Sequence, residues 1–132
     1  MNRRYFTLKE AQGLVVWLEE MFQALKTLRQ KLSSLNDEIQ KLETTITSNG
    51  GGAVGKKLTT HRSTLEKTTH LIEKNIRLIH DRGILVKSIE DGLVDFPSMR
   101  EGHEIYLCWR VGEPEIQYWH EVDAGFAGRE PL

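Results

Sequence analysis

The apolar spacing between Leu14 and Ile46 constrains the fold of this chain more than any other feature of its sequence. Apolar residues recur in alternating steps of four and three, at positions 14, 18, 21, 25, 28, 32, 35, 39, 42 and 46. Sustained over about four heptads, this repeat predicts a helix with the apolar seam of a coiled coil. Thr7 and Glu10 have the spacing of a capping box, so we expect the helix to start at residue 7 and to end near Thr47.

A second helix is predicted beyond a glycine-rich segment. Glycines at 50–52 are poor helix formers, and the spacing resumes at positions 54, 58, 61, 65, 68, 72, 76 and 79, before Gly83. Two helices joined by a linker at residues 48–55 predict an antiparallel helical hairpin over residues 7–82. The second helix is less apolar, because His61 and Thr68 occupy its seam. We interpret His61 as a packing residue, and the weaker seam would allow self-association into a homodimer.

Residues 84–132 have the pattern of a small antiparallel sheet. The segment 84–89 predicts one strand, and Leu93–Phe96 predicts a second that ends at Pro97. A hairpin supplies two further strands, which makes about four in all. The glycine-rich tail, residues 123–132, is expected to lie back on the sheet edge.

The hairpin consists of two β-rich runs, 105–111 and 116–122, around a turn at Gly112–Glu115. Side chains alternate between the two faces of a strand, so the register decides which of them meet. A slip of one residue would exchange the faces of one strand. With the turn at this position, Val111 faces Ile116, Cys108 faces Trp119 and Leu107 faces His120, which puts Cys108 and His120 on opposite faces.

The start of the first helix is apolar on more than one stripe, from Leu14 through Trp17 to Phe22. A helix of this kind needs more than one packing partner, and the sheet is the available one. The predicted fold class is therefore α+β. It is a long antiparallel coiled-coil helical hairpin followed by a small C-terminal antiparallel sheet, packed on the N-terminal end of the first helix. Residues 1–132 form one domain, with the hairpin at 7–82 and the β-rich cap at 84–132.

Composition excludes several classes of protein. The net charge is −1, and the basic residues are spread among acidic ones, so no nucleic-acid partner is expected. A single cysteine excludes an internal disulfide framework and favours a cytoplasmic location. The basic start, Met1–Phe6, is not followed by an apolar stretch, and no apolar run is long enough for a membrane span, so neither a signal peptide nor a membrane partner is expected.

The residues that carry chemistry lie in the last third of the chain. His120, Glu121 and Asp95 are suitable ligands for zinc or iron, with Cys108 and His103 as further candidates. The alternative is that His120 is a buried residue satisfied by a carboxylate such as Asp95. Cys108 has no histidine on its predicted face, so we expect an inert buried thiol. Glu113 and Glu115 flank Pro114 in the turn and are interpreted as solvated charges.

A binding surface is the other hypothesis for this region. Tyr106, Arg110, Trp119, Glu121 and Arg129 are of types that favour interfaces or complement a charged partner. We therefore expect a non-enzymatic protein-interaction or scaffolding module, with a protein partner or a second copy of the chain and no cofactor. The alternative is an enzyme that binds a metal, zinc or iron, or a small ligand around His120, Glu121 and Asp95.

Several motifs resemble one bacterial family, the domain of unknown function 2203. They are Gly92–Pro97, Leu107–Trp109, Gly112–Pro114, Trp119–Glu121 and Ala124–Arg129, together with the opening Phe6–Leu8 and Glu10–Ala11. The resemblance extends over essentially the whole chain. It implies the fold outlined above and no particular activity.

Overall fold

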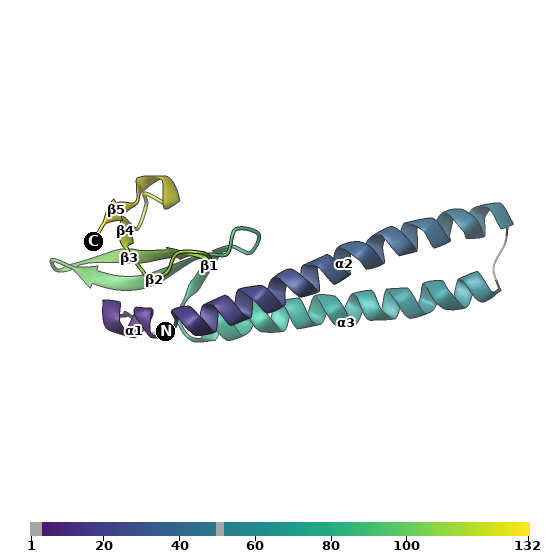
Figure 1. Cartoon of the computed structure of the whole chain (residues 1–132), viewed down its shortest axis with the longest axis horizontal. Helices are drawn as coiled ribbons and strands as arrows, with labels where there is room; N and C mark the ends of the chain where they lie inside the picture. Colours follow the sequence, from purple (N-terminus) through teal and green to yellow (C-terminus); the bar gives the residue numbers. More distant parts are fainter. Residues whose placement is uncertain (1–3, 50–51) are drawn as a thin grey trace. The chain divides into compact units, whose positions relative to one another are not determined.

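A computed structural model of the chain describes residues 4–49 and 52–132 (Figure 1). The fold is α+β, with helices followed by a five-stranded antiparallel sheet, as the sequence predicts at this level. Two compact units divide the chain. One contains residues 24–75, and the other contains residues up to Gln23 together with Ile76–Leu132.

The unit of residues 24–75 is built from parts of two long helices, α2 (Val15–Asn49) and α3 (Ala53–Asp81), which run in opposite directions in Figure 1. An ion pair of 3.0 Å between Arg62 Nη2 and Glu43 Oε1 joins them. Every position that the heptad spacing assigns to a seam is buried or half-buried. Thr68 is buried as well, and its hydroxyl donates to the Thr64 carbonyl at 2.7 Å, which satisfies the polar group within the helix.

The linker is shorter than predicted. The helices extend to Asn49 and restart at Ala53, so most of the expected linker at residues 48–55 is helical; Gly50 and Gly51 lie outside the described residues. At its C-terminal end, α3 stops at Asp81, and Gly83 has a φ of 88°. This is the left-handed conformation expected of a glycine after a helix, and it confirms the predicted terminator. In the parts of the chain that the structure describes, no helix is long and apolar enough to cross a membrane.

The first helix is broken, which the heptad spacing does not predict. The short helix α1 (Leu8–Gln12) has the predicted capping box, with Glu10 N donating to Thr7 Oγ1 at 3.1 Å and Thr7 N to Glu10 Oε1 at 2.8 Å. A turn at Gly13 and Leu14 then separates α1 from α2. Leu14 N donates to the Ala11 carbonyl, three residues back, so the helical ladder changes step there. Gly13 has a low helix propensity, which makes this the weakest point of the predicted helix.

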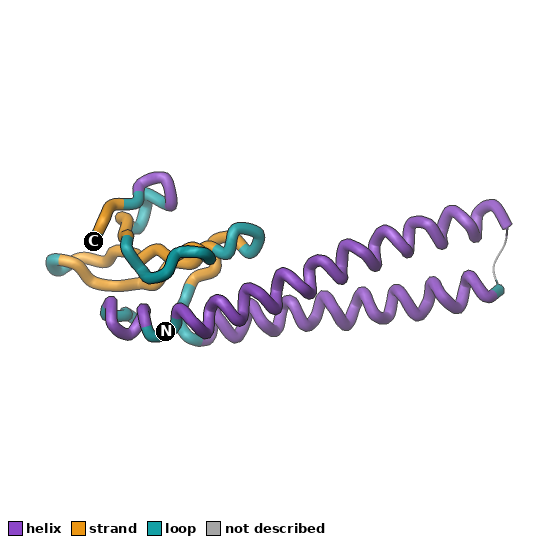
Figure 2. The backbone as a smooth tube through the Cα atoms, viewed as in Figure 1, coloured by secondary structure: helices purple, strands orange, loops and turns teal. Residues whose placement is uncertain are grey.

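The sheet contains β1 (Leu85–Ser88), β2 (Leu93–Arg100), β3 (His103–Arg110), β4 (Tyr118–Glu121) and β5 (Glu130–Pro131), in that spatial order, with a 3-10 turn, η1 (Phe126–Gly128), before β5. All neighbouring strands are antiparallel. The fifth strand comes from the tail, which confirms that the tail returns to the sheet edge. Figure 2 shows the strands in orange and the long loop between β3 and β4 in teal.

The prediction that β2 ends at Pro97 is wrong, because the strand continues to Arg100. The carbonyl of Pro97 accepts a hydrogen bond of 2.7 Å from Phe6 N. The N and O of one residue point to the same side of a strand, so the missing N–H of Pro97 faces the Phe6 segment and not β3. Proline is tolerated at such a position since β3 loses no hydrogen bond there.

The predicted register of the hairpin is also wrong, by one residue. Cys108 pairs with Tyr118, Leu107 with Trp119 and Tyr106 with His120. The predicted pairing of Val111 with Ile116 does not form, and both residues lie in the loop between β3 and β4. Val111 N donates to Gly92 O at 2.9 Å, and Ile116 N donates to Gln12 Oε1 at 2.7 Å. The loop is therefore longer than Gly112–Glu115, and every β4 side chain lies on the face opposite to the predicted one.

Strand β3 is buried on both faces, with each residue from Ile105 to Trp109 at most 6% exposed. On one face the N-terminal segment packs against the sheet: the Phe6 and Phe96 rings meet edge to face at 5.2 Å, and Ser98 Oγ donates to the Phe6 carbonyl at 2.6 Å. Figure 1 shows α1 on one side of the sheet and the β4–β5 segment curled over the other. Burial on both faces explains why the middle of β3, Ile105–Trp109, is a continuous apolar run without polar alternation.

Candidate functional site

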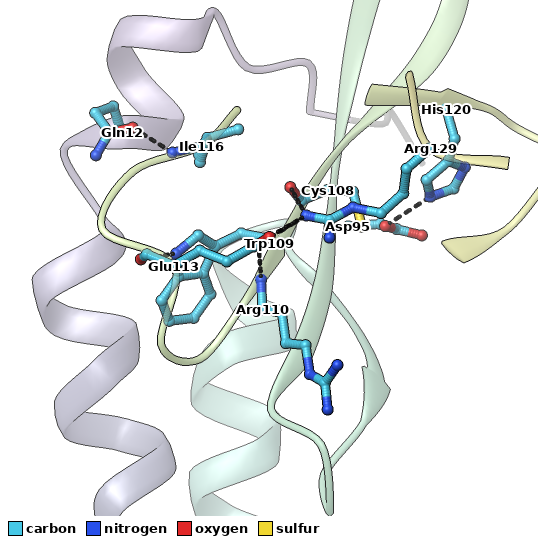
Figure 3. A network of polar contacts seen from close by, with 9 residues as sticks. All are labelled: Gln12, Asp95, Cys108, Trp109, Arg110, Glu113, Ile116, His120 and Arg129. Carbon is cyan, nitrogen blue, oxygen red and sulfur yellow. Dashed lines mark hydrogen bonds and ion pairs between the residues drawn. The ribbon is translucent and has the colours of Figure 1, made fainter. Parts of the chain in front are cut away.

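Three titratable side chains meet inside the sheet, on the face covered by the β4–β5 segment. They are Asp95 from β2, Cys108 from β3 and His120 from β4, and they are 2%, 0% and 1% exposed. Their ligand atoms all lie within 4.8 Å of one another. Asp95 pairs with Cys108 across β2 and β3, and the observed register places His120 beside them (Figure 3).

Hydrogen bonds hold the imidazole of His120 from both sides. Nδ1 is 2.7 Å from the Glu121 carbonyl oxygen, and Nε2 is 2.9 Å from Asp95 Oδ1. A carbonyl oxygen can only accept, so Nδ1 carries a proton. The contact between Nε2 and Oδ1 needs one proton, carried either by the imidazole or by the carboxyl group, and in both cases the pair has no net charge. The expectation that Asp95 satisfies His120 is confirmed.

The thiol of Cys108 is protonated in this environment. The pKa of Cys108 is raised from 9.0 to about 12, chiefly by burial and then by the charge of Asp95 and a hydrogen bond to it, while the charge of Arg129 acts in the opposite direction. A thiol of this kind is a poor nucleophile at neutral pH. The inference that Cys108 and His120 lie on opposite faces is wrong, because the register differs by one residue.

A second polar network, centred on Arg129 and Glu113, lies beside this cluster (Figure 3). Arg129 Nη2 is 2.7 Å from both carboxylate oxygens of Glu113, and it approaches the Cys108 carbonyl at 3.4 Å. Glu113 Oε1 also accepts from Arg110 N at 2.7 Å, and the Glu113 carbonyl accepts from Trp109 Nε1 at 3.1 Å. The guanidinium stacks on the Tyr118 ring at 4.1 Å. Together these contacts tie the β3–β4 loop to the C-terminal segment.

The residues predicted to form one binding surface are dispersed. Tyr106 is buried at 6% exposure, and Arg129 is engaged with Glu113. Arg110 is exposed and lies 3.8 Å from Asp91. Trp119 is half-buried beneath the guanidinium of Arg100, which is 4.4 Å from its ring centroid. Among the five predicted residues, Arg110 and Glu121 have side chains that are about half exposed, at 48% and 46%.

Glu121 does not join the other predicted metal ligands. Its carboxylate pairs with His103 at 3.3 Å, and both side chains are about half exposed, at 46% and 50%. The backbone of Glu121, not its side chain, contacts His120. The predicted set His120, Glu121 and Asp95 is therefore brought together only in part, with Cys108 in the place expected for Glu121.

Two hollows lie next to each other between the N-terminal segment and the end of the chain, and they share Leu8 and Leu132. The first, of about 440 Å³, is also lined by Tyr5, Met99 and Leu107. The second, of about 990 Å³, is also lined by Gln12, Ile116 and Pro131. We call the two together the Leu8 groove. Four of its apolar side chains are strongly exposed: Tyr5 at 45%, Leu8 at 44%, Met99 at 51% and Leu132 at 45%.

Sequence reasoning missed two residues that organise this region, Gln12 and Glu113. Gln12 is a polar residue in a helical pattern, and nothing in its local sequence indicates that its side chain bonds to Ile116, 104 positions away. Glu113 was expected to be a solvated loop charge, but its side chain is 19% exposed and paired with Arg129. A glutamate three residues after Arg110 in a Gly–Glu–Pro turn is able to reach back to that backbone N–H, and this was the available signal.

Comparison with known proteins identifies the family. No curated protein and no solved structure matches the chain. Residues 4–132 match the family described as "Uncharacterized conserved protein (DUF2203)", which covers nearly the whole sequence and agrees with the resemblance of its motifs. The chain belongs to the DUF2203 family.

Proposed function

We propose that this chain is a non-enzymatic protein-interaction or scaffolding module of the cytoplasm. In this proposal α2 and α3 form an antiparallel coiled-coil hairpin, and the sheet packs on the start of α2. Burial of Val15, Leu18 and Phe22 supports the packing, since these residues form the apolar start of the helix. Trp17 is half-buried, with the Arg82 guanidinium 4.4 Å from its ring.

The Leu8 groove is the observation that carries the proposal. It presents several large apolar side chains to solvent in two adjoining hollows, and exposed apolar patches of this kind mark interaction sites in soluble proteins. The second hollow of the groove, of about 990 Å³, is large enough for the side chains of a bound segment. Trp119 lies next to the groove, because its strand partner Leu107 and its covering residue Arg100 both line the first hollow.

The groove replaces the hairpin face as the proposed docking surface. Tyr106 and Arg129 point into the fold and have partners there, so they are not available to a second protein. The partner we propose is a protein segment that inserts apolar side chains beside Leu8 and Leu132. A second copy of the chain is one such partner.

An enzyme built on His120 is the less favoured function. As whole residues, Asp95, Cys108 and His120 are at most 2% exposed. Of the hollows formed by the described residues, neither part of the Leu8 groove is lined by any of the three. A substrate therefore has no direct access to these groups from the groove.

Site-specific photocrosslinking in the native cell tests the proposal. A photoreactive amino acid replaces Met99, which lines the groove, or Val122, which is 43% exposed and lines neither hollow of the groove. We expect one defined crosslinked product from position 99 and none from position 122. A product of twice the chain mass, with concentration-dependent sedimentation of the purified protein, would identify self-association.

Two charge substitutions provide the specificity control. Leu8→Asp places a carboxylate in the groove, whereas Val16→Asp places one at a site that is 71% exposed and does not line it. Leu8→Asp should abolish the product from position 99, and Val16→Asp should leave it unchanged. Loss of the product in both variants, or in neither, would refute the groove as the docking surface.

A further inference from the structure

The cluster of Asp95, Cys108 and His120 has the geometry of a metal centre. Three different strands supply one ligand atom each, and the three atoms lie within 4.8 Å of one another. A tetrahedral zinc ion with bonds of about 2.0–2.3 Å separates its ligands by about 3.3–3.6 Å. The observed Nε2 to Oδ1 distance of 2.9 Å and the 4.8 Å limit bracket that range. Small side-chain shifts are therefore sufficient to seat an ion.

The orientation of His120 matches that of a metal ligand. Metal-bound histidines commonly donate their second N–H to a backbone carbonyl or carboxylate, which fixes the ring and its tautomer. His120 Nδ1 makes this contact with the Glu121 carbonyl at 2.7 Å. That leaves Nε2, the nitrogen directed toward Asp95 and Cys108, as the ligating atom. The hydrogen bond from Nδ1 to Glu121 is thus a second observation in favour of a metal site, separate from the short distances among the three ligand atoms.

Charge balance also suits a divalent cation. Without metal the cluster holds a neutral thiol and a neutral His–Asp pair, so its net charge is zero. With metal, one thiolate and one carboxylate offset the two positive charges, and the net charge is again zero. Of the neighbouring charges, Arg129 is paired with Glu113, and Lys87 is exposed, so that solvent screens its charge. The site therefore buries no net charge either with or without the metal ion, which avoids the large free-energy cost of burying an uncompensated charge.

We propose that Asp95, Cys108 and His120 form a zinc-binding site, with the fourth coordination position filled by water or another small ligand. A thiolate, an imidazole and a carboxylate together favour zinc over the hard cations magnesium and calcium, which prefer oxygen ligands. The ion would join β2, β3 and β4 at the centre of the sheet. This inference is independent of the Leu8 groove and involves none of its residues.

Metal analysis and cobalt substitution test the site on the full-length protein. Protein prepared with zinc and freed of excess ion should retain about one zinc per chain, in keeping with a single three-ligand site. Cobalt(II) added to metal-free protein should give a thiolate-to-cobalt charge-transfer band and the visible bands of a tetrahedral complex. Cys108→Ser should remove the charge-transfer band, and Asp95→Asn should reduce metal retention at least tenfold.

The exposed pair His103 and Glu121 provides the matched control. Its atoms lie 3.3 Å apart on neighbouring strands, but the pair is about half exposed. His103→Gln and Glu121→Gln should retain zinc at the wild-type level. Loss of zinc in these variants, with retention in Cys108→Ser, would overturn the proposal in favour of a surface site.

The wild-type protein decides the matter even where a variant does not fold. Zinc should raise the midpoint of thermal unfolding of metal-free wild type, because binding to the native state alone stabilises it. Absence of both zinc retention and the thiolate-to-cobalt band in folded wild-type protein would refute the site. These readouts do not depend on any partner, so they are unaffected by the outcome of the crosslinking experiment.

Discussion

Replacing Asp95 and His120 singly and together gives the sharpest test of how the sheet interior is held. The His120 and Asp95 side chains are 2% and 3% exposed and lie 2.9 Å apart. Asp95→Val leaves the imidazole of His120 buried without its partner, and His120→Leu leaves the carboxylate in the same position. Removing one member of a buried ion pair destabilises a protein by about 3–5 kcal/mol.

The double substitution should be milder than either single one. A valine and a leucine fill the space with apolar side chains, and no charge is left unpaired. Two neutral groups lose a partner, the Cys108 thiol and the Glu121 carbonyl, at about 1 kcal/mol each. We therefore expect the free energy of unfolding of the double variant to be about 2 kcal/mol lower than that of wild type, and about 1–3 kcal/mol higher than that of each single variant.

Urea unfolding of metal-free protein, followed by circular dichroism, measures these differences. The slope of the free energy of unfolding against urea should be the same in all four proteins, so that midpoints compare stabilities. His103→Leu and Glu121→Val, singly and together, form the exposed control cycle and should change stability by at most about 1 kcal/mol. The reasoning would be refuted if the loss in the free energy of unfolding of the double variant at Asp95 and His120 equalled the sum of the losses of the two single variants.

Three further predictions concern other contacts of the sheet. Gly92→Ala should destabilise the protein by about 2–5 kcal/mol in the same urea assay, because Gly92 has a φ of 65° and the new Cβ would lie 2.3 Å from Val111 Cγ2. Glu113→Ala should cost about 3 kcal/mol, since it strands the Arg129 guanidinium, whose side chain is 13% exposed; a loss below 1 kcal/mol would show the pair to be dispensable. The pKa of Cys108 is raised to about 12 from 9.0, so the native state holds a proton that the unfolded state releases above about pH 9, and stability should fall between pH 9 and 12. Cys108→Ser should lose this part of the alkaline fall, and a slope identical to that of wild type would contradict the assignment.

Much of the local structure follows from neighbouring residues. The heptad spacing predicts which positions of α2 and α3 are buried or half-buried, because a helix brings residues three and four apart onto one face. Thr7 and Glu10 predict the start of α1, and Gly83 predicts the end of α3, since caps depend on one turn of chain. The helix break at Gly13 also has a local cause, but the heptad spacing of apolar residues does not indicate it.

The candidate site could be predicted only in its composition. Asp95, Cys108 and His120 are identifiable from residue type, and the pairing of Asp95 with His120 is predicted correctly. Their assembly with Cys108 depends on a register that the hairpin sequence does not contain. The turn favours pairing of Val111 with Ile116, but in the structure both residues lie in the loop, where the Gln12 side chain accepts from Ile116 N.

The sequence by itself determined the helices, their caps, the existence of the strands and the kinds of side chain in the last third of the chain. These depend on periodicity and on short-range hydrogen bonds, which operate between residues a few positions apart. The tertiary structure decided the register of β4, the passage of β2 through Pro97 and the burial of His120 beside Cys108. Each of these depends on contacts made by the N-terminal segment, at Phe6 and Gln12, or on the fold of the C-terminal segment over the sheet, and such contacts form only when distant parts of the chain pack together.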